Sequence, residues 1–115
     1  MTNRECLVRY LASANKIEEK HYETLPDNDA KSLLMALTVA QQNGAPLNVS
    51  QAMQMRRIGL PAKNHRKIND LLDASMIELA HDAGNRRTKF LIPTALAMAI
   101  FDELALALAQ ACNLK

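Results

Sequence analysis

Residues 56–94 read RRIGLPAKNHRKINDLLDASMIELAHDAGNRRTKFLIPT, and this stretch decides the fold. In its first half, Pro61 can begin a helix, because a proline in the first helical turn lacks only an N–H that would have no partner there. In its second half, apolar and polar side chains alternate on both sides of Gly84 and Asn85, residues that suit a tight turn. The stretch therefore predicts a short helix followed by a β-hairpin whose tip carries two adjacent arginines, Arg86 and Arg87.

The predicted helix has two chemically different sides, because successive side chains are rotated by about 100° around a helix. One side combines apolar residues with a histidine one turn earlier: His65, Ile68, Leu71 and Leu72. The other side carries charged residues: Lys63, Arg66, Lys67 and Asp70. The spacing predicts that the first side packs into the core and that the second, mainly basic side faces outward.

The two arms of the hairpin show the period of two that is typical of strands. On the first arm, Ile77, Leu79 and His81 alternate with Glu78 and Ala80, and on the second arm, Phe90 and Ile92 alternate with Lys89 and Leu91. The alternation predicts a strand on each arm of the hairpin.

Other stretches predict helices on either side of this segment. Residues 3–20 and 30–42 have apolar residues at helical spacing, and Asp27, Asn28 or Asp29 can provide the N-cap of the second helix. Ser50 is the expected cap of a short helix that runs to Met55, and Thr94 that of a final helix that runs to about Cys112. This final helix is apolar around nearly its whole circumference, so we expect it to need a second copy of the chain as a partner.

The composition bounds the architecture. A chain of 115 residues with 49% hydrophobic content has the size of a single domain, and an aromatic content of 3% favours helix packing over a sheet sandwich. We expect one mainly α domain with a small β-hairpin, spanning residues 1–115. Its predicted parts are an N-terminal dimerisation helix (1–25), a central core (26–93) and a C-terminal dimerisation helix (94–115).

Positive charge is concentrated in the middle of the chain. Residues 56–67 contain no acid and five basic residues: Arg56, Arg57, Lys63, Arg66 and Lys67. Arg86, Arg87 and Lys89 form a second cluster, whereas the first 29 residues are rich in acids. A polyanion is the expected partner of these clusters, and an ordinary solvated basic face is the alternative.

Several functional classes are not indicated. The sequence has no nucleophile elbow, phosphate-binding glycine loop or paired catalytic carboxylates, so we expect no enzyme activity, no catalytic residues and no cofactor. The three histidines have no ligand spacing, and Cys6 and Cys112 form no C-x-x-C motif, so we expect no metal site and a reduced, cytoplasmic setting. Without a signal peptide or an apolar run long enough for a bilayer, we expect no membrane contact.

Three local motifs resemble those of the MarR family of bacterial winged-helix regulators. Residues 85–94 are similar to the wing of that family, where a basic pair and apolar strand residues lead into the dimerisation helix, although Asn85 stands where an acid is usual. Residues 71–77 are similar to the end of the recognition helix, with Ser75 where glycine is usual. Residues 49–60 resemble the helix and turn that precede the recognition helix.

This resemblance implies a homodimer that binds double-stranded DNA as a transcriptional regulator, with two recognition helices reading the halves of an inverted repeat. It places the DNA contacts at Lys63, Asn64, Arg66, Lys67, Arg86, Arg87, Arg56 and Arg57. The dimer would be held by apolar residues of the two terminal helices: Leu7, Leu11, Leu96, Ile100, Leu104 and Leu108. A small-molecule effector is compatible with this reading, but the sequence indicates no particular one.

The sequence is compatible with other roles for some of these residues and with other functions. Either Asn64 or Arg66 could reach a base edge, since asparagine suits adenine and arginine suits guanine. Arg87 could instead be a structural partner of Asp82 or Glu78. The chain could also be a winged-helix module that binds another protein, a relative of PadR-like regulators, or a DNA-binding segregation or replication accessory factor of a plasmid or phage.

Overall fold

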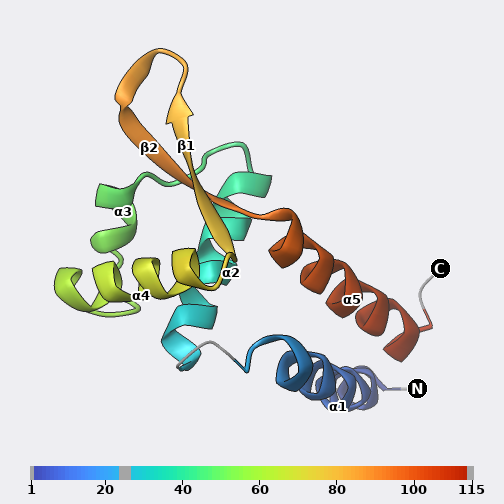
Figure 1. Ribbon diagram of the computed structural model, residues 1–115. Coiled ribbons are helices and arrows are strands. Elements are labelled where there is room, and N and C mark those ends of the chain that lie inside the picture. The colour runs from blue at the N-terminus through green and yellow to red at the C-terminus, as the bar shows by residue number, and fades with distance from the viewer. Residues whose placement is uncertain (1, 24–26, 114–115) are drawn as a thin grey trace. The chain divides into compact units, whose positions relative to one another are not determined.

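The computed structural model describes residues 2–23 and 27–113, except for the side chain of Arg86. Over these residues the chain forms five helices and a two-stranded antiparallel hairpin (Figure 1). In chain order the elements are α1 (Asn3–His21), α2 (Asn28–Gln42), α3 (Val49–Met53), α4 (Pro61–Asp73), β1 (Ile77–Asp82), β2 (Asn85–Pro93) and α5 (Ala95–Ala111). The chain divides into two compact units, Leu25–Ala97 and the pair of segments Met1–Thr24 and Met98–Lys115.

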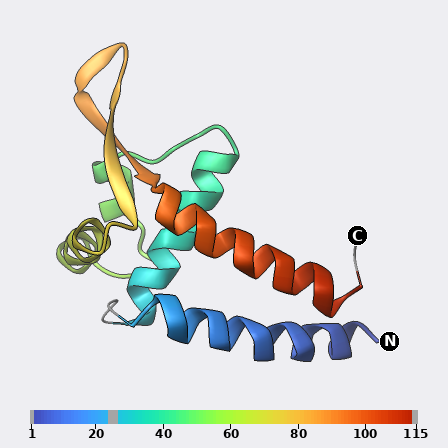
Figure 2. The ribbon, with the colours of Figure 1, turned by 45° about the vertical axis from the view of Figure 1, so that its right-hand side comes forward.

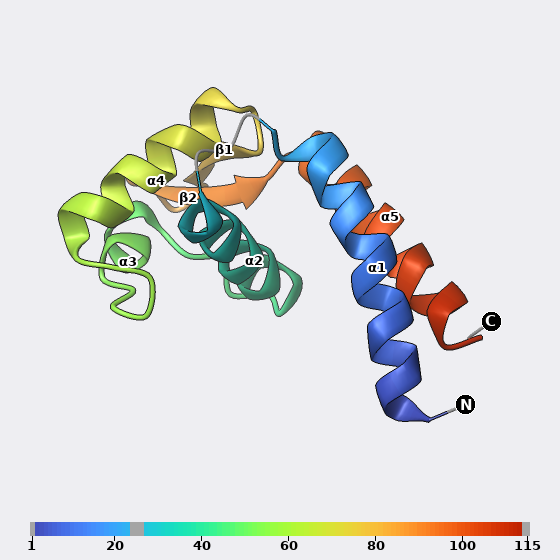
Figure 3. The same ribbon diagram turned by 90° about the horizontal axis from the view of Figure 1, so that it is seen from below.

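The unit of residues 25–97 is built around α2. This helix packs against α4 and β2, and α4 also packs against the short α3 (Figures 1 and 3). Fully buried leucines from α2, α4 and β2 form the core: Leu33, Leu34, Leu37, Leu71 and Leu91. The apolar spacing predicted for α2 is therefore confirmed at its three leucines.

The hairpin forms where it was predicted, and its register determines which residues of the second arm face the core. The register pairs Ile77 with Pro93 and Leu79 with Leu91, which places Leu91 on the same face as Ile77. Leu91 is completely buried, whereas Phe90 is only half-buried. In addition, the Leu91 N–H donates to the Leu47 carbonyl oxygen at 2.9 Å, so the extended segment before α3 pairs with β2.

Several helix ends follow from local chemistry. Asp27 is the N-cap of α2, one of the three candidates, and accepts a hydrogen bond from the Ala30 N–H. The expected Ser50 cap was wrong: α3 begins two residues earlier than predicted, because Asn48 forms a reciprocal capping box with Gln51. The Thr94 cap is confirmed, since Thr94 Oγ1 accepts a hydrogen bond from the Ala97 N–H at 3.2 Å.

The α4 helix ends in a Schellman motif at Ser75. Ser75 has a φ of 59°, its N–H donates to the Leu72 carbonyl, and the Met76 N–H donates to the Leu71 carbonyl. Glycine adopts this conformation without strain, whereas Ser75, which has a Cβ, pays a steric cost there.

The second unit is formed by α1 and most of α5, which lie side by side (Figure 2). Glu103 of α5 joins the two helices, because it pairs with Lys20 at 3.3 Å and with His21. Desolvation raises the pKa of Glu103, but the hydrogen bonds from His21 and Lys20 outweigh this effect and lower it. Tyr22, which follows α1, is buried, and burial raises its pKa to about 12.

Among the described helices, none is both long enough and apolar enough to cross a bilayer.

Candidate nucleic-acid interface

The solvent-facing side of α4 is a stripe of exposed residues at spacings of three and four. These residues are Ala62, His65, Arg66, Asn69 and Asp73. The placement of His65 on the core side was wrong, because its side chain is exposed. Asn69 also lies on this side but is not among the predicted contacts, although its spacing of three residues from Arg66 places it beside that arginine on the helix.

Asn64 does not belong to this exposed surface. Its side chain is completely buried, and Nδ2 donates to the carbonyl oxygens of Ala52, Met53 and Met55 at 3.3, 3.1 and 3.0 Å. These carbonyls lie at the end of α3 and in the turn after it, and those of Ala52 and Met55 also accept backbone N–H groups, from Met55 at 3.2 Å and from Ile58 at 3.0 Å. The prediction that Asn64 contacts DNA is therefore corrected: the amide holds the turn between α3 and α4.

A close approach at Gly59 accompanies this contact. A Cβ on Gly59 would lie 2.7 Å from Cδ of Lys63 and 3.2 Å from Oδ1 of Asn64. The glycine therefore leaves room for the first turn of α4 to pack against the preceding loop.

The two lysines of α4 are paired with the beginning of α2. Lys63 Nζ lies 2.6 Å from Asp29 Oδ2, and Lys67 Nζ donates to Asp27 Oδ2. The Lys67 side chain is only 12% exposed and has Asp70 as a further neighbour at 3.9 Å. The hydrogen bond from Lys67 is the main reason that the pKa of Asp27 lies below its usual value. Both ammonium groups thus have carboxylate partners within the chain.

At the hairpin, Arg87 and Lys89 are exposed. The hairpin turn is organised by side-chain acceptors, because Asp82 Oδ1 accepts from the Gly84 N–H and Asn85 Oδ1 accepts from the Arg87 N–H, both at 3.0 Å. Within the described residues, no ion pair joins Arg87 to Asp82 or Glu78, so the structural role considered for Arg87 finds no support. The side chain of Arg86, also predicted to contact DNA, lies outside the described residues.

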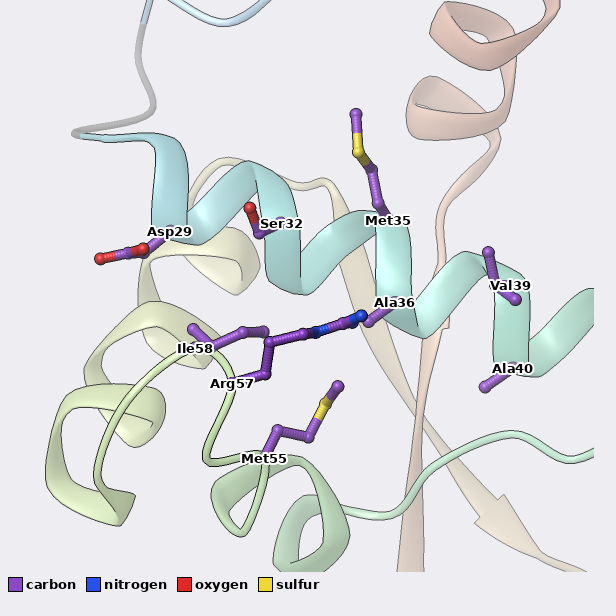
Figure 4. Close-up of a pocket in the computed structure, with 9 residues that line it drawn as sticks. All are labelled: Asp29, Ser32, Met35, Ala36, Val39, Ala40, Met55, Arg57 and Ile58. Carbon is purple, nitrogen blue, oxygen red and sulfur yellow. The ribbon is translucent and has the colours of Figure 1, made fainter.

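Arg56 and Arg57 lie in the segment between α3 and α4 and are both exposed. The Arg57 side chain extends toward Ala36 of α2 across an open groove of about 620 Å³ (Figure 4). The walls of the groove are mainly apolar and include Met35, Val39 and Met55.

The residues predicted to hold a dimer divide into two groups. The exposed fractions of Leu7, Leu11, Leu96 and Leu108 are 54%, 47%, 49% and 46%. Ile100 and Leu104, by contrast, are only 1% and 7% exposed. Those two residues are therefore removed from the predicted dimer surface, because they already pack within their own chain.

The two cysteines lie close together in the unit of α1 and α5. A side-chain hydrogen bond to Cys6, together with desolvation, raises the pKa of the Cys112 thiol. The neutral thiol is thus favoured over the reactive thiolate. The described residues hold no group of three or more histidine, cysteine or acidic side chains that could bind a metal ion.

No protein-family model and no curated protein sequence matches the chain. Solved structures do match its fold. RV1404 from Mycobacterium tuberculosis aligns with a TM-score of 0.62 and 18% identity, over 93% of this chain and 67% of that one. The adhesin competence repressor AdcR from Streptococcus pyogenes aligns with a TM-score of 0.53 and 17% identity, over 97% of this chain and 78% of that one.

Both matches are winged-helix regulators of the MarR family. The fold of this chain is a MarR-like winged helix-turn-helix, mainly helical with a β-hairpin wing, as the sequence predicted. In this fold α3 and α4 form the helix-turn-helix, and the hairpin is the wing.

Proposed function

We propose that this protein binds double-stranded DNA as a homodimer and regulates transcription, acting as a repressor in the cytoplasm. The observation that carries the proposal is the exposed stripe of α4, where Arg66 stands without an acidic partner among the described residues. A recognition helix enters the major groove, and an exposed arginine on it can bind a guanine edge. The MarR-like fold supports the same conclusion.

The exposed basic residues of the wing and of the turn before α4 are suited to contacts with phosphates. Arg87 and Lys89 lie on the wing, and Arg56 and Arg57 lie in the turn before α4. Arg86 joins this group by its place in the sequence of the hairpin. Arginine and lysine side chains at such positions fix a protein on the duplex without reading its sequence.

The dimer in this proposal uses the exposed leucines of α1 and α5. Leu7 and Leu11 of α1 and Leu108 of α5 belong to one compact unit, and each exposes about half of its side chain. A second copy of the chain can cover them and bring two α4 helices to the halves of an inverted repeat.

A second function is favoured by one observation, the apolar groove beside α2. Met35 and Val39 are 43% and 60% exposed there, which is the kind of surface that binds a protein partner. In this alternative the winged-helix fold is a protein-interaction module. Salt separates the two proposals, because phosphate contacts weaken steeply with salt and apolar docking does not.

The test is a DNA-binding titration at several salt concentrations with duplex fragments of the source genome. We expect salt-sensitive binding and a preferred fragment. Arg66→Ala should weaken binding to that fragment by about 1–3 kcal/mol, whereas Arg86→Ala and Arg87→Ala should weaken binding to all sequences alike. Arg4→Ala, which removes an exposed arginine of α1, is the matched control and should leave affinity unchanged. If the wild-type protein binds no duplex in a salt-sensitive way, the DNA-binding proposal is wrong.

A further inference from the structure

We infer that the protein reads its DNA sequence with Arg66 and Asn69, flanked by His65, and that Lys63 and Lys67 are structural ties that do not contact DNA. This inference rests on the proposed function and specifies it. It reassigns the basic cluster of α4, because the two lysines of the cluster have carboxylate partners in the fold, whereas Arg66 is exposed and has no acidic partner among the described residues.

The side chains of α4 point to two opposite sides of the helix, one exposed and one buried. At about 100° per residue, His65, Arg66 and Asn69 fall within an arc of about 100° on the exposed side. Asn64, Ile68 and Leu71 are buried on the other side of the helix. A helix that inserts its exposed side into a groove therefore presents these three polar side chains first.

The side chains of Arg66 and Asn69 can recognise two different bases by hydrogen bonding. The arginine can donate two hydrogen bonds to O6 and N7 of guanine, and the asparagine can donate to N7 and accept from N6 of adenine. Three residues of helix rise about 4.5 Å, close to the spacing of about 3.4 Å between stacked base pairs. The two side chains are thus placed to read neighbouring base pairs, one with guanine and one with adenine.

His65 and Ala62 flank this pair on the same exposed stripe. A neutral imidazole offers one donor and one acceptor, so His65 can bond to a base edge or a phosphate. The methyl group of Ala62 can contact the methyl group of a thymine. These two residues add contacts but carry less discrimination than a bidentate pair.

Lys63 and Lys67 pair with acidic residues of α2 instead of belonging to the exposed stripe of α4. Lys63 bonds Asp29 at 2.6 Å, and Lys67, with 12% of its side chain exposed, bonds Asp27. Both aspartates belong to the start of α2, so the two ion pairs tie α4 to α2. To reach a phosphate, each ammonium would have to leave a carboxylate that already neutralises it, and little favourable energy would remain.

The experiment is a selection of bound duplexes from a random library, performed with the wild type and with single variants. Asn69→Ala should lose the preference for adenine at one position of each half-site, with affinity for that base reduced by about ten- to hundredfold. Arg66→Ala should lose the preference for guanine at a neighbouring position to a similar extent. Asn15→Ala, an exposed asparagine of α1, is the matched control and should return the wild-type sequence.

The lysine variants test the second half of the inference. Lys63→Ala and Lys67→Ala should return the wild-type consensus with the wild-type salt dependence, and should lower the midpoint of urea unfolding. A decrease of about one in the salt slope for either variant would show a phosphate contact and overturn the structural role. If Lys67→Ala fails to fold, the salt dependence of DNA affinity in Lys63→Ala decides the question, because the Lys63 side chain is 39% exposed.

The outcomes separate the inference from the proposed function. If the wild type selects a sequence and Asn69→Ala selects the same one with every preference intact, the reading by Asn69 is wrong while DNA binding stands. If the wild type selects no sequence and binds no duplex, the proposed function fails and the inference fails with it.

Discussion

Asn64 shows how one buried amide can add hydrogen bonds to the backbone hydrogen bonds of a turn. Its Nδ2 group serves carbonyls of the α3 end and of the following turn, and among the described side chains it is the buried polar one that does so. Oδ1 of the same amide has no partner among the described groups. The donor side of the amide is therefore the part that stabilises the fold.

We predict that Asn64→Ala lowers the free energy of unfolding by about 1–3 kcal/mol, because it removes a buried amide that donates to three backbone carbonyl oxygens. Urea unfolding followed by circular dichroism measures this change. Asn69→Ala is the matched control, since it removes an exposed asparagine from the same helix and should change stability by less than about 0.5 kcal/mol. Equal effects of the two substitutions would contradict the anchoring role of Asn64.

A second prediction about a single residue concerns the backbone of Ser75. Its φ of 59° lies in the left-handed region, which costs a residue with a Cβ about 1–2 kcal/mol. Ser75→Gly should therefore raise the free energy of unfolding by up to about 1 kcal/mol, after the larger entropy of glycine in the unfolded chain is allowed for.

The control for Ser75 is the same substitution in regular helix. Ser32 is an exposed residue of α2, so Ser32→Gly should lower the free energy of unfolding by about 0.5–1 kcal/mol. The two changes should have opposite signs in one thermal or urea melt. A destabilising Ser75→Gly would mean that the serine has an interaction that compensates for its backbone.

Among the elements, α2 and α4 are joined by paired charges as well as by leucines. The pKa of Asp27 is lowered, mainly by the hydrogen bond from Lys67, so the folded state favours the ionised carboxylate. Its stabilising contribution is present above the ordinary pKa of aspartate, about 3.9, and is lost as the pH falls through the lower folded value.

We predict that Asp27→Asn reduces the acid sensitivity of stability below about pH 4, because asparagine keeps the N-cap of α2 but has no charge to lose. At neutral pH the loss should stay below about 1 kcal/mol, since the carboxylate is partly exposed and screened by solvent. Unfolding free energies measured between pH 3 and pH 7 provide the comparison, with Asp102→Asn on α5 as the control. An unchanged pH profile in Asp27→Asn would contradict the coupling to Lys67.

The elements also show what local sequence can predict. The hairpin, the start of α4 at Pro61 and the Thr94 cap depend on residues within one or two turns of each other, and all were predicted. The phase of β2 was not, because Phe90, Leu91 and Ile92 are all apolar and alternation cannot distinguish among them. Only pairing with β1 and with Leu47 selects Leu91 for the core.

The candidate site was harder to predict than the fold, because its decisive contacts are distant in sequence. Lys67 meets Asp27 across 40 positions, and Asn64 reaches back to carbonyls 9 to 12 positions earlier. Composition identified a basic cluster but could not tell which cations have carboxylate partners. Arg66 kept its predicted outward place, whereas Asn64 did not.

At the scale of the whole molecule, the exposed leucines of the terminal helices lead to a test of assembly. We predict that Leu7→Lys and Leu108→Lys each weaken the dimer at least about tenfold, because a lysine buried in an apolar interface is costly. Sedimentation equilibrium over a range of protein concentrations measures this change. Leu104 is not suitable for this test, because its side chain is buried within its own chain and its loss would affect folding.

Leu60→Lys is the control for assembly. Leu60 is 66% exposed but lies just before α4, so a lysine there should leave the dimer intact. A wild-type protein that is monomeric at micromolar concentration would contradict the dimer directly.

The residues that hold α4 in place differ from those on its exposed stripe, and this separation has an evolutionary consequence. Asn64, Lys63 and Lys67 hold the helix in place through contacts made away from the exposed stripe, so His65, Arg66 and Asn69 can be exchanged without loss of those contacts. Random mutations at the three exposed positions should be tolerated by folding, while mutations at Asn64 should destabilise the protein. Descendants of this protein can thus acquire new target sequences through a few surface substitutions, with the scaffold that carries them left unaltered.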